Sequence, residues 1–204
     1  MATKQVLVVA RTRMYGGKVC IGALSDAGEN LRLMNQHCDS DLGTKSIYRV
    51  GEWWQVECEP CGTKTPPHVE DVSVAVAKKL GLQDNLAQYL NKATKPWKGP
   101  IDVLFDGKIR FTGNGGGYIS PADVPAGATG FWIPDSPLTL DVDERDKRGY
   151  YNNHRHLSYV GTEEEVDVIP AGTLVRVSLA RWWKPRDADP SFEERCYAQL
   201  SGWY

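Results

Sequence analysis

The stretch that decides the fold class is Val50-Gly51-Glu52-Trp53-Trp54-Gln55-Val56-Glu57-Cys58-Glu59, in which a glycine leads into a run of alternating side chains. In an extended strand, Trp54, Val56 and Cys58 would lie on one face, and the residues that alternate with them would lie on the other. A period of two with aromatic and β-branched residues is typical of a strand whose one side is buried. The stretch therefore predicts a strand of a small β-barrel or β-sandwich.

A second stretch, residues 171–178, repeats the pattern of residues 50–57. Gly172 stands where Gly51 stands, and alternation follows through the longer run Thr173–Trp183. One such strand in each half of the chain indicates a duplicated small barrel.

Working outward, short apolar runs bounded by turn residues predict further strands at regular spacing. They cover residues 4–10, 19–24, 31–34, 69–76, 101–105, 108–112, 130–134, 138–142, 156–160 and 195–204. Asp106-Gly107 between two of these runs predicts a hairpin turn. Helical spacing of apolar residues occurs once, over Leu82–Ala93, and Pro96 and Pro100 follow it.

These elements predict an all-β fold with minor α content, made of two small barrels packed as one compact unit. The first domain would be residues 1–98, with the helix near its end, and the second would be residues 99–204.

Composition narrows the class of protein. The 204 residues include seven Trp and nine Tyr and carry a formal charge of −2, without the basic excess of a general nucleic-acid binder. The basic residues are unevenly spread, however, because residues 1–18 and 176–186 contain no acid. No apolar run approaches the ~18 residues of a membrane span, and the start lacks a signal-peptide pattern. Five cysteines, an odd number, are expected to be reduced, so we expect a soluble cytoplasmic protein that does not insert in a membrane.

Motifs that could carry chemistry are weak. Cys58-Glu59-Pro60-Cys61 has the spacing of half a zinc site, but no second such pair exists and Cys58 would point inward, so neither a metal nor a cofactor is expected. The glycine-rich loop 113–117 fits neither phosphate-loop pattern, although phosphate binding by its amides stays open. Asp106-Gly107-Lys108 is a fragment seen in nucleases, and the turn already explains it. With no catalytic residues to assign, we expect a binding module rather than an enzyme.

Basic and aromatic residues are interleaved in three segments, which are residues 11–15, 148–156 and 181–184. Cations bind phosphates while aromatic faces stack on bases, and barrel proteins hold single strands in this way. Cation–π packing at the rim of an ordinary core is the alternative.

Several longer stretches resemble a bacterial family of dual OB-containing domains. The resemblance is carried by Thr12-Arg13-Met14 with Gly16-Gly17 and Cys20, by residues 29–33, 65–71, 111–115, 130–135, 157–161 and 172–183, and by the ending 194–204. It implies two OB-like β-barrels, nucleic-acid or nucleotide ligands by fold analogy, and a place in prokaryotic defence systems.

The leading hypothesis is therefore an accessory module that binds single-stranded or structured nucleic acid and works beside other protein subunits. Phosphate contacts and stacking contacts are predicted for Arg11, Arg13, Tyr15, Arg32, Tyr118, Trp132, Tyr151, Arg155, Arg176, Arg181 and Trp182. Arg181 would be usable only if its strand ends or twists out of the core before it. The alternatives are a sensor of a small nucleotide or modified base, in a pocket formed by the loop 113–117 and Trp132, and a protein-interaction adaptor.

Overall fold

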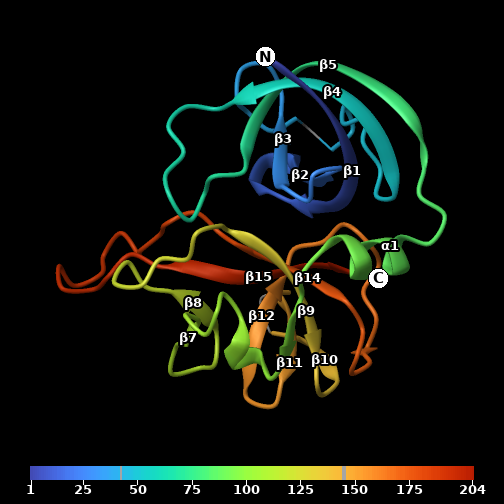
Figure 1. Ribbon diagram of the computed structural model, residues 1–204. Coiled ribbons are helices and arrows are strands. Elements are labelled where there is room, and N and C mark those ends of the chain that lie inside the picture. Colours follow the sequence, from blue (N-terminus) through green and yellow to red (C-terminus); the bar gives the residue numbers. More distant parts are fainter. Residues whose placement is uncertain (42, 144–145) are drawn as a thin grey trace. The chain divides into compact units, whose positions relative to one another are not determined.

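The computed structural model describes residues 1–41, 43–143 and 146–204, and it divides into two compact units. The first unit is Met1–Lys95 and the second is Pro96–Tyr204 (Figure 1). The division falls in the proline-containing stretch that follows the helix. Each unit is described by itself below.

The first unit consists of five strands, a single turn of 3₁₀ helix and one α-helix among its described residues. They are β1 (Ala2–Arg13), η1 (Tyr15–Gly17), β2 (Val19–Ser25), β3 (Asn30–Met34), β4 (Glu52–Pro60), β5 (Asp71–Leu82) and α1 (Leu86–Ala93). The helix begins later than the predicted Leu82 because β5 continues through that residue. Asn85 caps α1, and its side chain accepts a hydrogen bond from the Gln88 N–H.

The five strands close into a barrel in the order β1-β2-β3-β5-β4. Neighbours are antiparallel except β3 and β5, which are parallel. This is the five-stranded Greek-key barrel of the OB fold. Trp54, Val56 and Cys58 are all buried in the barrel core, so the one-sided burial of β4 is confirmed.

A bulge in β1 changes which side chains face the barrel interior. The register with β2 shifts between Val8 and Ala10, so that Arg11 lies opposite Ile21 and Arg13 lies opposite Val19. Directly opposed residues share a face of the sheet, and Ile21 and Val19 belong to the core. The two arginines therefore follow the interior face of β1 to the open end of the barrel.

Among its described residues, the second unit contains ten strands and one turn of 3₁₀ helix. They are β6 (Trp97–Gly99), η2 (Ile101–Val103), β7 (Arg110–Phe111), β8 (Gly117–Ile119), β9 (Thr129–Pro134), β10 (Leu138–Val142), β11 (Arg148–Asn152), β12 (Arg155–Tyr159), β13 (Val168–Ile169), β14 (Val175–Leu179) and β15 (Cys196–Trp203).

The strand order of this unit repeats that of the first barrel. Along the sheet β10-β11-β12-β15-β14-β9, all neighbours are antiparallel except β12 and β15, which are parallel. Only residues 135–137 separate β9 from β10. If β9 and β10 are one interrupted strand, they correspond to β1, and β11, β12, β14 and β15 correspond to β2, β3, β4 and β5. The second unit is thus a second OB barrel whose first strand is broken.

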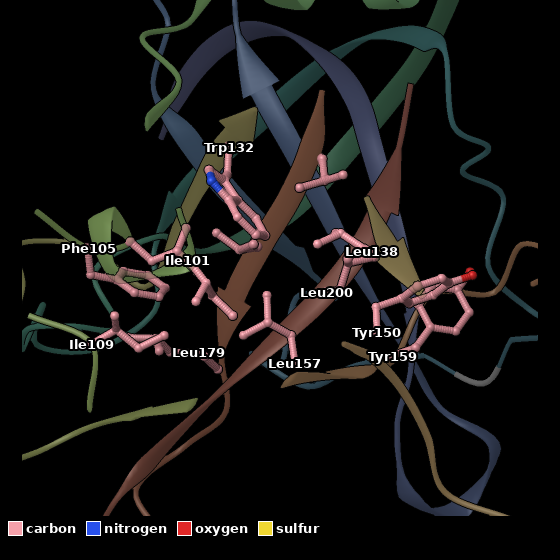
Figure 2. Close-up of a cluster of buried hydrophobic side chains, with 14 of the residues drawn as sticks. Ile101, Phe105, Ile109, Trp132, Leu138, Tyr150, Leu157, Tyr159, Leu179 and Leu200 are labelled. Atoms are coloured by element: carbon pink, nitrogen blue, oxygen red, sulfur yellow. The ribbon is translucent and has the colours of Figure 1, made fainter. Parts of the chain in front are cut away.

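The core of the second unit is aromatic and aliphatic, and Figure 2 shows its side chains packed between the strands. Trp132 is fully buried there, and its indole N–H donates to the Gly99 carbonyl at 2.9 Å. Tyr150 and Tyr159 meet edge to face, with ring centroids 5.5 Å apart. Apolar burial of this kind stabilises each unit from within.

The predicted hairpin over residues 101–112 is wrong. Residues 101–103 form the turn η2, and Phe105 and Asp106 both take positive φ, so Asp106-Gly107 lies in an irregular turn rather than between two strands. Asp106 also accepts a hydrogen bond from the Trp97 indole at 2.9 Å.

Candidate nucleic-acid interface

OB barrels bind oligonucleotides on the outer face of their second and third strands, helped by the loop between strands 1 and 2 and the loop between strands 4 and 5. We name these loops L12 and L45. In the first barrel they are residues 14–18 and 61–70, beside β2 and β3. In the second barrel the described part of L12 is residues 143 and 146–147, and L45 is residues 180–195, beside β11 and β12.

All three basic–aromatic segments fall on these ligand-binding elements. Residues 11–15 run from β1 into L12 of the first barrel, residues 148–156 form the strand pair β11 and β12, and residues 181–184 lie in L45 of the second barrel. Segments far apart in the sequence thus lie on the elements with which OB folds in general bind their ligands.

In the first barrel, L12 carries the most exposed aromatic residue. Tyr15 is as accessible as in an isolated peptide, and Arg13 before it is also exposed. Arg11 is partly buried, and its Nη2 donates to the Gly43 carbonyl at 3.3 Å. Arg13 and Tyr15 are therefore both exposed in this segment, while Arg11 helps to hold the segment after β3.

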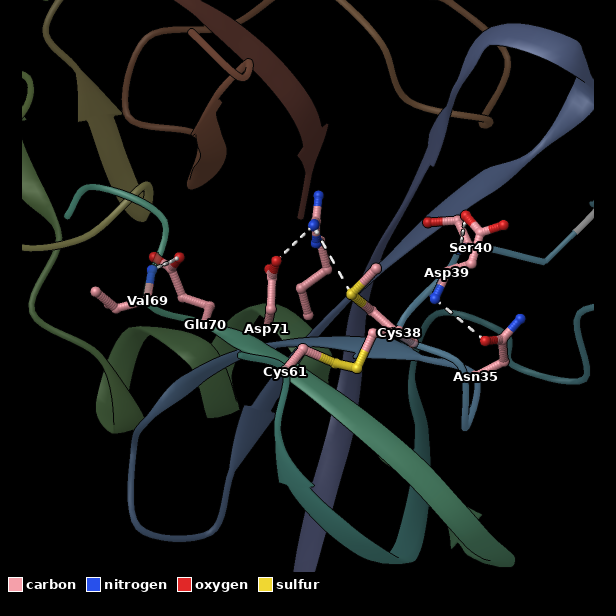
Figure 3. A network of polar contacts seen from close by, with 10 residues as sticks. Asn35, Cys38, Asp39, Ser40, Cys61, Val69, Glu70 and Asp71 are labelled. Atoms are coloured by element: carbon pink, nitrogen blue, oxygen red, sulfur yellow. Dashed lines mark hydrogen bonds and ion pairs between the residues drawn. A yellow bond between two sulfur atoms is a disulfide. The ribbon is translucent and has the colours of Figure 1, made fainter. Parts of the chain in front are cut away.

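Arg32 of β3 is held by a carboxylate. Its Nη2 lies 2.6 Å from Oδ2 of Asp71, and both side chains are mostly buried (Figure 3). The same nitrogen is 3.8 Å from the sulfur of Met34. Asp71 neutralises the positive charge of Arg32, so Arg32 would contribute less to phosphate binding than the sequence predicts.

Beside this pair, Cys38 and Cys61 form a disulfide that links the segment after β3 to the start of L45 (Figure 3). The expectation that all five cysteines are reduced is wrong for these two, because their Cα atoms lie 5.7 Å apart, which suits a bridge. Cys58 is instead buried in the barrel core, as its strand register predicts. Since disulfides persist in oxidising compartments, the cysteines no longer argue for a cytoplasmic setting.

In the second barrel, a hollow of about 440 Å³ lies on the outer face of β11 and β12. Gly149 is one of the residues that line this hollow. Gly149 pairs with Asp141 on one side and Ser158 on the other, so three outward positions in a row carry at most small or short side chains. Its other lining residues include Thr112, Asn114, Gly116, Lys147, Tyr151 and His156.

Two rings form one wall of the hollow. Tyr151 and His156 are cross-strand partners and stack with centroids 4.6 Å apart at an interplanar angle of 26°. Burial lowers the pKa of His156, which Asp141 only partly opposes, so the imidazole is neutral at neutral pH. Burial, Asp141 and Asp143 raise the pKa of Tyr151, so its hydroxyl stays protonated. The wall is therefore uncharged and aromatic.

The glycine-rich loop closes over this wall but does not offer a phosphate cradle. The amides of Gly115 and Gly116 donate to the carbonyl and the hydroxyl of Thr112, at 2.9 and 3.0 Å. A Cβ at Gly115 would come within 1.9 Å of the His154 carbonyl oxygen. The glycines thus permit close approach of the loop to β12, and phosphate binding by these two amides is excluded by their internal bonds.

L45 of the second barrel presents the third segment. Because β14 ends at Leu179, Arg181 leaves the sheet and is exposed. Trp182 instead packs against the core, and its neighbour Trp183 is 53% exposed, with its ring 6.0 Å from that of Tyr197. Of the two neighbouring rings, that of Trp183 is therefore the one exposed to solvent.

Arg155, at the start of β12, already has two partners. It forms an ion pair with Asp102, and its guanidinium lies 4.3 Å above the Phe111 ring. It is partly exposed at the edge of the glycine-rich loop. These contacts fix the side chain and reduce its freedom to follow a ligand.

Three predicted contact residues are buried, and the prediction is wrong for them. Trp132 is fully buried because β9 lies in the middle of the sheet. Arg176 is 4% exposed because both faces of β14 are covered. Tyr118 is 8% exposed, and the Arg195 guanidinium covers its ring at 4.3 Å. None of these rings or charges can reach a base or a phosphate in this structure.

The sequence did not single out Gly149, His156 or Trp183 as site residues. His156 and Trp183 stand inside the basic–aromatic segments, so the pattern contained them. Gly149 carried a signal too, because a glycine inside a strand often marks a close approach of another group.

These two barrels, with basic and aromatic residues on their ligand-binding elements, define a double OB-fold protein. The model of the dual OB-containing domain family matches residues 4–203, and the chain belongs to that family. No curated protein and no solved structure matches the chain. Among the described residues, no helix is both long and apolar enough to cross a membrane.

Proposed function

We propose that this protein is a nucleic-acid-binding module that takes single-stranded nucleic acid on its OB barrels. The proposal rests on where the three basic–aromatic segments lie. They fall on L12 of the first barrel and on β11, β12 and L45 of the second. Cations at these places would neutralise phosphates, and exposed rings would stack on bases. The family supports the same class of ligand.

The near-neutral total charge argues for moderate rather than tight binding. Arg13, Lys147 and Arg181 are exposed cations on these elements, and so small a number would act on only a few phosphates. Each neutralised phosphate releases counterions, so affinity falls with salt at about −0.7 in log–log slope per phosphate for a single strand. The proposal is a binding module and not an enzyme.

A sensor of a small nucleotide is the second candidate, and the hollow over Gly149 favours it. A volume of about 440 Å³ lies within the ~300–1,000 Å³ range of small-molecule sites. The pocket differs from the predicted one, because Trp132 is in the core and contributes nothing to it. A role as an accessory to other proteins in a prokaryotic defence system stays a prediction from the family resemblance.

Fluorescence anisotropy with labelled single-stranded DNA, single-stranded RNA and duplex DNA tests the proposal. We expect saturable binding of a single strand at low salt, weakened linearly in log–log form as salt rises, and weaker binding of the duplex. If none of the three probes binds at low salt, the proposed function is wrong.

A further inference from the structure

On the outer face of β11 and β12, the position of Gly149 has no side chain. An ideal Cβ at Gly149 would lie 3.3 Å from Cε2 of Tyr151, which is tighter than ordinary contact, and 3.5 Å from Cδ2 of His156, which is ordinary contact. Gly149 does not have the positive φ that requires glycine, so its backbone does not explain the residue. What glycine provides here is space beside two stacked rings.

The same rings carry an unused polar atom. Nδ1 of His156 is buried and has no hydrogen-bond partner among the residues that the structure describes. A buried nitrogen without a partner costs free energy, so the His156 ring keeps this position at the expense of one unmade hydrogen bond. Its ring also faces the glycine-rich loop, because an ideal Cβ at Gly116 would lie 3.5 Å from its Nε2.

Charge decides which part of a nucleotide would enter. Asp141 is exposed on the outer face opposite Gly149, and Asp143 lines the hollow and accepts a hydrogen bond from the Lys147 N–H, so two carboxylates lie in or beside the hollow. The amides of Gly115 and Gly116 are already bonded to Thr112. A phosphate would be repelled there and would find no amide cradle, whereas an uncharged heterocycle would meet a neutral aromatic wall. Lys147 lies at the exposed rim, where a phosphate would be attracted.

From this geometry we propose that the hollow over Gly149 binds one nucleobase, with the base against the Tyr151–His156 wall and its phosphate outside, toward Lys147. This inference rests on the proposed function and deepens it, because it names the group that enters the second barrel. The base belongs either to a free nucleotide or to one unpaired position of a single strand. Stacking on an aromatic wall suits every base, since each has a π face.

The test follows two probes, adenosine 5′-monophosphate and a labelled oligoadenylate, with wild-type protein and with Tyr151→Leu and Tyr151→Phe. Tyr151→Leu keeps apolar bulk and removes the aromatic face, while Tyr151→Phe keeps the face and removes only the hydroxyl. We expect Tyr151→Leu to weaken binding of whichever probe binds by about tenfold or more, as loss of a stacked base does, and Tyr151→Phe to stay within about twofold of wild type. Amide NMR shifts should centre on Gly149 and Gly116.

Gly149→Val is the second variant, since its side chain would enter the space beside Tyr151 and His156 and narrow the hollow. The melting temperature is measured for every variant. If either Tyr151→Leu or Gly149→Val does not fold, the conclusion is drawn from the one that does. Binding of the monophosphate alone, sensitive to Tyr151→Leu, supports a free-nucleotide source. Binding of the oligonucleotide alone, with the same sensitivity, supports a base within a strand. Equal oligonucleotide affinity in wild type, Tyr151→Leu and Gly149→Val would overturn the base site and leave the proposed function standing. No binding of either probe would overturn both.

Discussion

Gly51 and Gly172 occupy the same position in the two barrels. The Gly51 N–H donates to the Val8 carbonyl of β1 at 2.9 Å, and the Gly172 N–H donates to the Pro134 carbonyl of β9 at 2.8 Å. Their φ angles are +85° and +82°. Each glycine therefore ties the entry of barrel strand 4 to barrel strand 1 through a left-handed turn, which is why the repeat was visible in the sequence.

Replacing either glycine by alanine should destabilise its own barrel. An L side chain in the left-handed region costs about 1–2 kcal/mol, and neither site offers a compensating contact because no atom lies within 4 Å of an added Cβ. We expect Gly51→Ala and Gly172→Ala each to lower the free energy of unfolding by about this amount in urea titrations.

Gly81→Ala is the matched control for these two variants. Gly81 of β5 also has open space around an added Cβ, but its φ lies outside the left-handed region. It should therefore not lose stability. A loss as large in Gly81→Ala as in Gly51→Ala would show that turn conformation is not the cause.

The sequence predicts the barrel strands because their alternation is local, and it predicts the duplication because two glycines mark it. It cannot predict the position of Arg11 and Arg13, since a bulge between Val8 and Ala10 exchanges the faces of β1 beyond that point. It also misplaces Arg176, because alternation assigns the residue to the face opposite Val177 but does not reveal that both faces of β14 are covered.

The candidate site is less predictable than the fold because it is assembled from distant segments. Gly149 and His156 lie on adjacent strands, but the loop that closes the hollow comes from residues 112–117 and pairs through Gly116 with His156. Long-range pairing of this kind leaves no periodic signal. Trp132 illustrates the opposite error, because an aromatic residue near a glycine-rich loop in sequence proved to be the centre of the core.

Arg181 and Arg176 should respond to substitution in opposite ways. Arg181 is exposed in L45, so Arg181→Ala should leave the melting temperature unchanged and reduce the log–log salt slope of single-strand binding by about 0.7, the contribution of one phosphate. Arg176 is buried, so Arg176→Ala should lower the free energy of unfolding by about 1–3 kcal/mol. Anisotropy titrations across a salt series, with thermal melts, measure both. An unchanged slope in folded Arg181→Ala would remove this residue from the interface.

The Cys38–Cys61 disulfide should stabilise the first barrel. It closes a loop with a sequence separation of 23 residues, and a bridge over a loop of this size contributes about 3 kcal/mol by restricting the unfolded chain. We expect Cys38→Ser to lower the urea midpoint under non-reducing conditions and to abolish the effect of added dithiothreitol. Cys20→Ser is the control, because Cys20 is a free cysteine and its replacement should leave the response to reductant intact. Identical midpoints for wild type with and without reductant would contradict the prediction.

Glu52 should make the first barrel sensitive to acid. Burial alone would raise the pKa of Glu52, but hydrogen bonds from Lys79 Nζ at 2.5 Å, the Arg49 N–H at 3.0 Å and Trp54 Nε1 at 3.1 Å outweigh it and hold the pKa below its ordinary value of 4.5. A carboxyl whose pKa is lower in the folded state stabilises the fold above its unfolded pKa. That stability is lost as pH falls from about 4.5 through the folded pKa.

The measurement is the free energy of unfolding of wild type and Glu52→Gln as a function of pH. Glu52→Gln should be less stable than wild type at neutral pH, and the difference should shrink as the pH falls below about 4.5. Glu57→Gln, an exposed carboxyl of the same strand, should remain close to wild type throughout. A difference between Glu52→Gln and wild type that stays constant down to strong acid would show that ionisation of Glu52 does not contribute.

The neighbouring tryptophans of L45 separate binding from stability. Trp183 is 53% exposed and its ring lies 6.0 Å from that of Tyr197, so a base can reach it, whereas Trp182 packs on the core of the second barrel. Trp183→Ala should weaken single-strand binding by about 1–3 kcal/mol with little change in melting temperature. Trp182→Ala should lower the free energy of unfolding by up to about 3 kcal/mol, since it removes a large side chain that is only half-buried.

Trp183→Phe keeps an aromatic face and should retain most of the affinity, which distinguishes stacking from a change in the shape of the loop. If Trp183→Ala binds as tightly as wild type while Trp182→Ala, still folded, binds more weakly, the loop presents the other ring to the ligand and the assignment is reversed.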